Sequence, residues 1–166
     1  MVNARKLMTG LLVTFFLLSA VGDASAGSQK GTAQSGMKTA KAVFDVNVTS
    51  PEKLLFMLEM VERTFRELRS ERVRPLFVVA FRGQSSKYLI ISGKHLTSDQ
   101  AELGEEIAEM IKRLKKTGMR LEQCYISAEI FDIESGEFYP ELLIVQNGYL
   151  SLIKYQAKGY AYVPMQ

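Results

Sequence analysis

Leu76-Phe77-Val78-Val79-Ala80-Phe81 is an unbroken apolar run, and this stretch decides the fold class. Runs without polar alternation are typical of strands that are covered on both faces, as in a parallel sheet. Amphipathic helix patterns precede and follow this run in the chain. Because strands that alternate with helices form parallel sheets, the order of the patterns predicts an α/β domain with a mostly parallel sheet.

Two helix patterns flank the central run. The first begins at Thr49-Ser50-Pro51, where a hydroxyl cap precedes proline at the first helical position, and extends to about Ser70. The second begins at Thr97, whose capping-box partner is Gln100, and ends at Gly118. Each pattern carries one apolar stripe at helical spacing, so each helix is expected to cover one side of the sheet.

Four shorter patterns predict the remaining strands, at Ala42–Val48, Met119–Tyr125, Leu142–Val145 and Tyr160–Val163. Asn147-Gly148 is compatible with a hairpin turn or a helix start. We favour the helix, because Leu150, Ile153 and Ala157 follow at helical spacing. The segment Ser85–Ile91 fits either a short strand or a helical turn.

The N-terminal residues have the three parts of a secretory signal. Arg5 and Lys6 precede a fourteen-residue apolar run, and Ala24-Ser25-Ala26 is a small-residue cleavage site. The run is shorter than the roughly twenty residues that span a bilayer, so no stable membrane insertion is expected after cleavage. The sequence thus predicts a signal peptide over 1–26, a disordered leader over 27–40 and one α/β domain over 41–166. In a Gram-negative bacterium the expected location is periplasmic; simple secretion and an uncleaved anchor are the alternatives.

The charge of the chain disfavours nucleic-acid binding. The formal net charge is +3, and removing Arg5, Lys6 and Asp23 with the signal leaves +2. Nucleic-acid binders usually carry a strong basic stripe. The arginines between positions 63 and 74 alternate with glutamates, which is typical of a solvated helix face.

Cys124 is the only cysteine, so it has no partner for an internal disulfide. It lies near the end of a predicted strand, where free backbone N–H groups can favour thiolate over thiol. A thiolate in this position is a candidate carrier of sulfane sulfur as a persulfide. The alternative is a small buried apolar side chain without chemistry.

Arg82, Gly83, Gln84 and Ser85 follow the central strand and form a second candidate site. Glycine permits an unusual backbone angle, and the arginine and hydroxyl groups are donors that suit an anion such as a sulfur oxyanion. A turn with solvated charges is the alternative interpretation.

Other classes of chemistry lack support in the sequence. His95 is the only histidine and has no ligand at metal-binding spacing, so no metal site is expected. The absence of a C-x-x-C pair disfavours a thioredoxin-type enzyme. No organic cofactor is expected, because the chain has no glycine-rich nucleotide loop.

Three segments together resemble the DsrE/DsrF-like (YchN-like) family. Val78-Val79-Ala80-Phe81-Arg82-Gly83 is similar to its "VVAFRG" segment, and Met119–Cys124 resembles its "G-V-x-F-x-x-C" segment. The ending from Asn147 to Pro164 resembles the family's "G-x-x-x-L-x-x-x-Q-x-x-G-Y-A-x-x-P" tail. The resemblance implies a three-layer α/β sandwich with a five-stranded sheet, assembled as a homo-trimer or homo-hexamer.

The resemblance also implies a function for Cys124. Well-known members of that family relay sulfur between donor and acceptor proteins as a persulfide on one cysteine, and Cys124 matches this cysteine. The first hypothesis is therefore an exported sulfur carrier, with Arg82 and the backbone near Gly83 stabilising the thiolate. The second hypothesis is a non-catalytic oligomeric binding or assembly module in which Cys124 is buried and inert.

Overall fold

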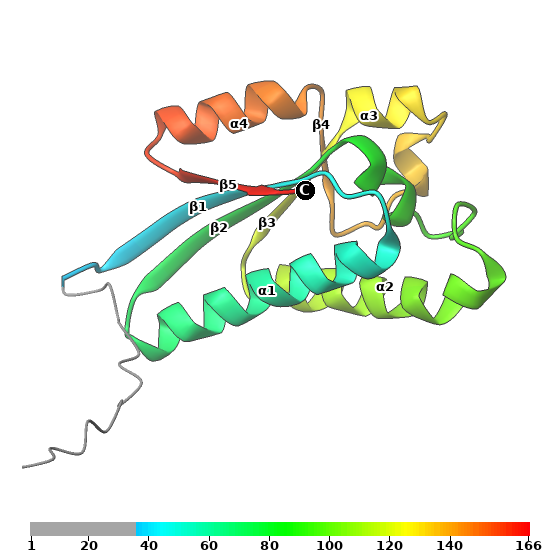
Figure 1. Ribbon diagram of the computed structural model, residues 1–166. Coiled ribbons are helices and arrows are strands. Elements are labelled where there is room, and N and C mark those ends of the chain that lie inside the picture. The colour runs from blue at the N-terminus through cyan, green and yellow to red at the C-terminus, as the bar shows by residue number, and fades with distance from the viewer. Residues whose placement is uncertain (1–35) are drawn as a thin grey trace, which may run out of the picture. The chain divides into compact units, whose positions relative to one another are not determined.

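Five parallel strands form one sheet in the computed structural model, which describes residues 36–166 (Figure 1). The strand order across the sheet is β4-β3-β2-β1-β5, so the apolar run of the sequence lies at the centre. The strands are β1 (Thr39–Val46), β2 (Arg74–Phe81), β3 (Arg120–Cys124), β4 (Leu143–Val145) and β5 (Ala161–Met165).

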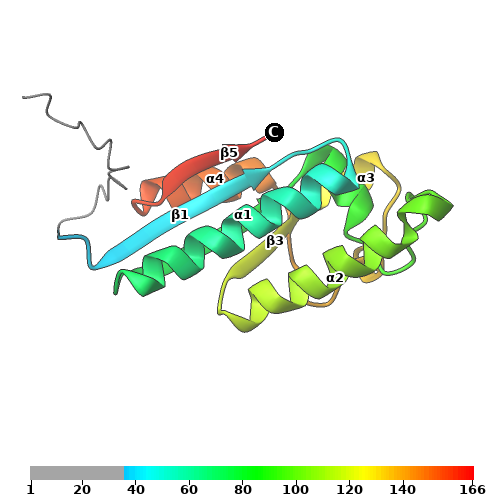
Figure 2. The same ribbon diagram turned by 60° about the horizontal axis from the view of Figure 1, so that its bottom comes forward.

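Helices cover both faces of the sheet, and the predicted three-layer α/β architecture is confirmed (Figures 1 and 2). The long helices α1 (Pro51–Ser70) and α2 (Ala101–Lys116) lie on one face. The shorter helices α3 (Tyr125–Ile130) and α4 (Gly148–Ala157) lie on the other, as Figure 1 shows. Short 3₁₀ helices occupy Gly83–Tyr88, Ser98–Gln100 and Ser135–Glu137.

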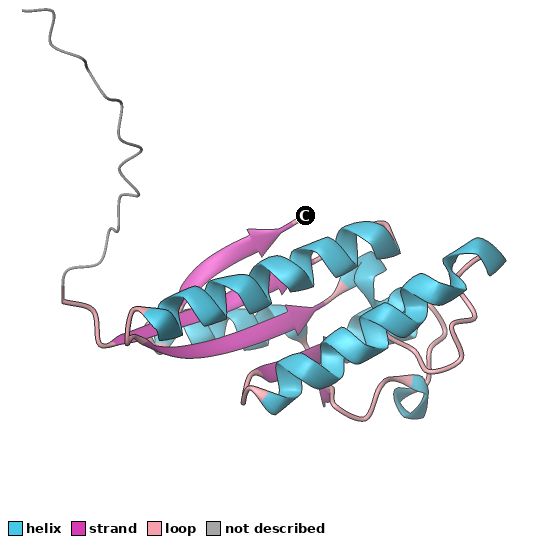
Figure 3. Ribbon diagram, turned by 90° about the horizontal axis from the view of Figure 1, so that it is seen from below, coloured by secondary structure: helices cyan, strands magenta, loops and turns pink. Residues whose placement is uncertain are grey.

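The main hydrophobic core lies between the sheet and the pair α1 and α2, which pack side by side (Figure 3). Phe44 of β1 and Phe77 of β2 contact each other edge to face at 4.9 Å, and Phe65 of α1 meets Phe77 at 5.7 Å. Leu58 and Val61 of α1 are fully buried against this layer. Burial of these side chains is the main source of stability for the fold.

The face toward α4 has a much smaller apolar cluster. Val43, Val78 and Ala80 contact Leu152 of α4, with Tyr155 at the margin. Alternate residues of a strand point to the same side, so this face also carries the buried carboxylates of Asp45 on β1 and Glu122 on β3. The two faces of the sheet are therefore chemically different, and the polar one carries the candidate site.

Most element boundaries agree with the sequence patterns, with three differences. β1 begins at Thr39, three residues earlier than predicted and within the range expected for the leader. The ambiguous segment after β2 is the 3₁₀ helix Gly83–Tyr88. The helix α3, which was not predicted, has only six residues and no full apolar period. The helix start at Asn147 is confirmed, since its side chain caps α4.

The predicted signal peptide over 1–26 and most of the leader lie outside the described residues. Within residues 36–166, no helix combines the length and the apolar composition that crossing a bilayer requires.

The packing of α1 predicts different costs for two truncations on the same helix. Leu58 is fully buried, whereas Phe56 is 54% exposed. Leu58→Ala is expected to lower the free energy of unfolding by about 2–5 kcal/mol, because it removes buried methyl groups and leaves a cavity. Phe56→Ala is the control, with an expected loss below about 1 kcal/mol. Urea unfolding measures both, and equal losses would contradict this account of the core.

Candidate functional site

Cys124 lies where three elements meet, at the end of β3 and the beginning of α3 and α4. It is the last residue of β3 and the N-cap of α3, and its side chain is only 2% exposed. The N–H of Gly148, the first residue of α4, donates a hydrogen bond to Cys124 Sγ at 3.2 Å. The sulfur is therefore buried, and its neighbour is a backbone donor at the positive end of a helix.

The local sequence explains why this donor is directed at the sulfur. The side chain of Asn147 caps α4 by accepting hydrogen bonds from the N–H groups of Tyr149 and Leu150. The N–H of Gly148 is not used by this cap, and it donates to Cys124 Sγ instead. Glycine at this position permits the approach, because a Cβ would lie 3.0 Å from Cys124 Cβ and 3.2 Å from Sγ.

Gln123 fixes the end of β3 from the opposite face. Its Nε2 donates to Ser86 Oγ at 2.7 Å and to the backbone oxygen of Cys124 at 2.9 Å. Gln123 is fully buried, and its Oε1 has no hydrogen-bond partner among the described residues. Ser127 of α3 accepts from the N–H of Gly83 at 2.7 Å, which ties α3 to the loop after β2.

Arg82, which was predicted to stabilise the thiolate, forms an ion pair with Asp45. Its Nε and Nη2 donate to the two oxygens of Asp45 at 2.6 and 2.7 Å. Asp45 is 1% exposed, and Tyr162 donates to it at 2.6 Å. The guanidinium also lies over the ring of Tyr149, 4.8 Å from its centroid. The hydrogen bonds to Asp45 raise the pKa of Arg82, and the same carboxylate raises the pKa of Tyr162.

The remaining residues of the predicted anion site hydrogen-bond within the protein. The N–H of Gly83 donates to Ser127, and that of Gln84 donates to Asn47 Oδ1 at 3.2 Å. The hydroxyl of Ser85 is buried and accepts from the N–H of Val48 at 2.8 Å. Gly83 has φ +57°, and a Cβ there would collide with the side chain of Asn47. These hydrogen bonds connect the loop after β2 to the end of β1 and to α3.

Glu122 is a second buried carboxylate on the α4 face, and sequence analysis did not identify it. It is 2% exposed and accepts from Arg120 Nε at 2.5 Å, from Tyr155 at 2.7 Å and from the hydroxyl of Ser151. Burial of Tyr155 is the main reason why its pKa is raised, and the hydrogen bond to Glu122 raises the pKa further. The one signal in the sequence is the two-residue spacing that places Arg120, Glu122 and Cys124 on one side of β3.

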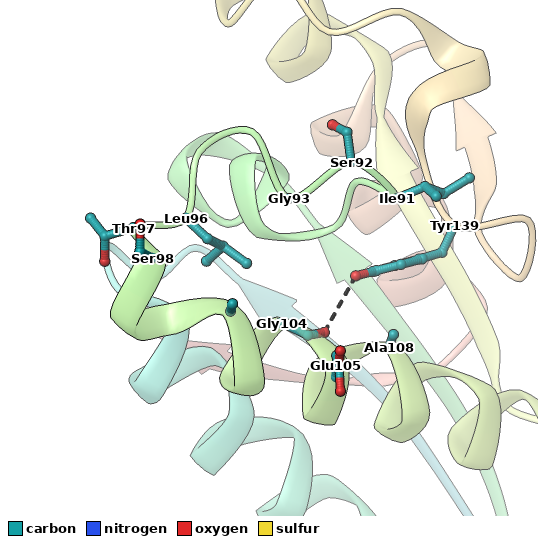
Figure 4. Close-up of a pocket in the computed structure, with 11 residues that line it drawn as sticks. Ile91, Ser92, Gly93, Leu96, Thr97, Ser98, Gly104, Glu105, Ala108 and Tyr139 are labelled. Carbon is teal, nitrogen blue, oxygen red and sulfur yellow. Dashed lines mark hydrogen bonds between the residues drawn. The ribbon is translucent and has the colours of Figure 1, made fainter.

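A separate pocket of about 480 Å³ lies between the loop 91–98 and α2 (Figure 4). Leu96 and Ile91 contribute apolar walls, and Tyr139 donates to the backbone oxygen of Gly104 at 3.5 Å. None of the predicted site residues lines this pocket. Within residues 36–166, no cluster of histidine, cysteine or carboxylate side chains could hold a metal ion.

Comparison with known proteins identifies the fold alone. The structure is similar to that of a protein of unknown function from Methanobacterium thermoautotrophicum, with a TM-score of 0.61 and 14% sequence identity. The match covers 75% of this chain and 98% of that chain. No protein-family profile and no curated protein sequence matches the chain. The resemblance to the DsrE/DsrF-like family stays a prediction.

The ion pair between Asp45 and Arg82 predicts a large effect of a small substitution. Asp45→Asn keeps the shape of the side chain but leaves the guanidinium, only 12% exposed, without its counter-charge. We expect a loss of about 3 kcal/mol in the free energy of unfolding. Glu109→Gln is the matched control, because it breaks an exposed ion pair with Lys112 and should cost less than about 1 kcal/mol. Equal effects in urea unfolding would refute this role for Asp45.

Proposed function

We propose that this protein binds and transfers sulfane sulfur as a persulfide on Cys124. The observation that supports the proposal best is the hydrogen bond from the N–H of Gly148 to Cys124 Sγ. A backbone donor at a helix N-terminus stabilises an anion more than a neutral thiol. In a persulfide the negative charge lies on the outer sulfur, about 2 Å from Sγ, which is still close to the positive end of α4.

The proposed transfer needs no external oxidant or reductant. The Cys124 thiolate attacks the outer sulfur of a donor persulfide, a new S–S bond forms, and the donor leaves as a thiolate. An acceptor thiolate then attacks the outer sulfur on Cys124, which breaks that S–S bond and restores the Cys124 thiolate. Each step exchanges one S–S bond for another, so electrons and sulfur atoms balance.

Access to the sulfur requires movement of the first turn of α4. Cys124 is 2% exposed, and Gly148 is in direct contact with it. The turn is capped by Asn147 and is tied to the sheet through the contact of Tyr149 with Arg82. A single short turn can open without unfolding the domain, because the main core lies on the opposite face of the sheet.

The test is intact mass of the native protein after treatment with inorganic polysulfide. We expect the wild type to gain one sulfur atom that dithiothreitol removes, and Cys124→Ser to gain none. Urea-unfolded wild type controls for the reagent, since its thiol is freely accessible. A native protein that stays unmodified while the unfolded chain reacts would refute the proposal.

A second candidate function is an oligomeric assembly module, and a specific surface favours it. Tyr149, Leu150 and Ile153 of α4 and Tyr162 of β5 are each at least 41% exposed, and we call this set the α4 apolar surface. Arg82 connects its two tyrosines, since it lies over Tyr149 and shares Asp45 with Tyr162. Exposed apolar patches of this kind mark protein interfaces.

The α4 apolar surface predicts self-association that one charge would weaken. We expect the protein over 36–166 to form a homo-oligomer in light scattering coupled to size-exclusion chromatography, and Ile153→Glu to shift it toward monomer. Phe56→Glu on α1 is the control, because Phe56 is similarly exposed but lies on the other face of the sheet. A monomeric wild type, or equal dissociation by both variants, would exclude this surface as the interface.

A further inference from the structure

A groove of about 400 Å³ runs along the flank of α4 that faces β3 and β4. Its polar lining comes from Arg120, Glu122, Asn147, Ser151, Lys154 and Lys158. Leu150 belongs to both the groove and the α4 apolar surface, whereas Tyr149 and Ile153 do not line the groove. The groove adjoins the site described above and shares Glu122, Asn147 and Ser151 with it.

The lining of the groove carries excess positive charge. Glu122 at its base is already bound by Arg120, Tyr155 and Ser151, so its charge is compensated. Lys154 and Lys158 are exposed, and within residues 36–166 neither forms an ion pair. Two free ammonium groups beside the side-chain amides of Gln146 and Asn147 are suited to an anionic ligand.

One end of the groove lies beside the thiol. Val145 of β4, which lines the groove, pairs with Cys124 in the sheet, and Asn147 immediately precedes Gly148. Lys154 is seven positions beyond Asn147, which is about 10 Å along a helix at about 1.5 Å per residue. A ligand with its anionic group at Lys154 can therefore place a sulfur atom near Cys124 when the first turn of α4 opens.

We propose that the groove binds the sulfur donor, and that this donor is a small thiol persulfide with carboxylate groups several bonds from its sulfur. The inference rests on the proposed function of Cys124 and names the class of substrate. Inorganic sulfur oxyanions are also anionic, but they are only a few ångströms across, shorter than the roughly 10 Å along the helix between Asn147 and Lys154. The carboxylates remain at the lysines while the outer sulfur passes to Cys124, and the donor leaves as its thiolate.

The experiment uses glutathione, a tripeptide thiol with two carboxylates, as the probe and the Cys124→Ser protein as the receptor. This variant removes the sulfur chemistry and leaves binding alone. NMR titration should show saturable shifts at the backbone N–H groups of Ser151 and Lys154. Lys154→Gln combined with Lys158→Gln should raise Kd roughly tenfold, and added salt should weaken binding.

The control variant is Lys115→Gln combined with Lys116→Gln, which removes the same charge from the exposed end of α2. Absence of saturable binding, shifts elsewhere, or an equal effect of the control pair would overturn the inference. Thiosulfate that binds the groove while glutathione does not would overturn the substrate class. The mass assay with polysulfide does not depend on the groove, so failure of the inference and failure of the proposed function can be told apart.

Discussion

The ion pair between Asp45 and Arg82 is the interaction on which the arrangement of the α4 face depends. Asp45 belongs to β1 and Arg82 follows β2, while Tyr162 of β5 and Tyr149 of α4 bind the same pair. Four elements thus converge on one buried carboxylate. Burying charge is costly, and the bidentate geometry with its additional hydroxyl donor offsets that cost. The contact of Tyr149 with Arg82 links the first turn of α4, which includes Gly148, to this pair.

The two faces of the sheet differ in the side chains that they bury. The face toward α1 and α2 is filled with aromatic and aliphatic side chains, and it supplies most of the buried apolar area. The face toward α4 has a small apolar cluster and holds the carboxylates of Asp45 and Glu122 together with Cys124. None of the side chains of the main core belongs to α4.

Much of the fold could be predicted from periodicity. The central strand, the two long helices and the helix start at Asn147 follow from patterns that are local in the sequence. The six-residue helix α3 could not be found in this way, because it is shorter than two helical turns. Local patterns also place Arg82 near the thiol, but its partner is 37 positions earlier in the chain. The register of β1 and β2 places Asp45 beside the end of β2, and this is what allows Asp45 to form the ion pair with Arg82. The buried role of Glu122 likewise depends on Tyr155 and Ser151 of α4, which are distant in sequence.

The hydrogen-bond donor to Cys124 Sγ is a main-chain group, the N–H of Gly148. Substitution of neighbouring side chains does not delete a peptide N–H, so the polarity around the sulfur is a property of the chain path. A search for a partner residue, such as a histidine beside the cysteine, would overlook this kind of centre. Superposition of backbones can detect this hydrogen bond, because it depends on where α4 begins relative to the end of β3.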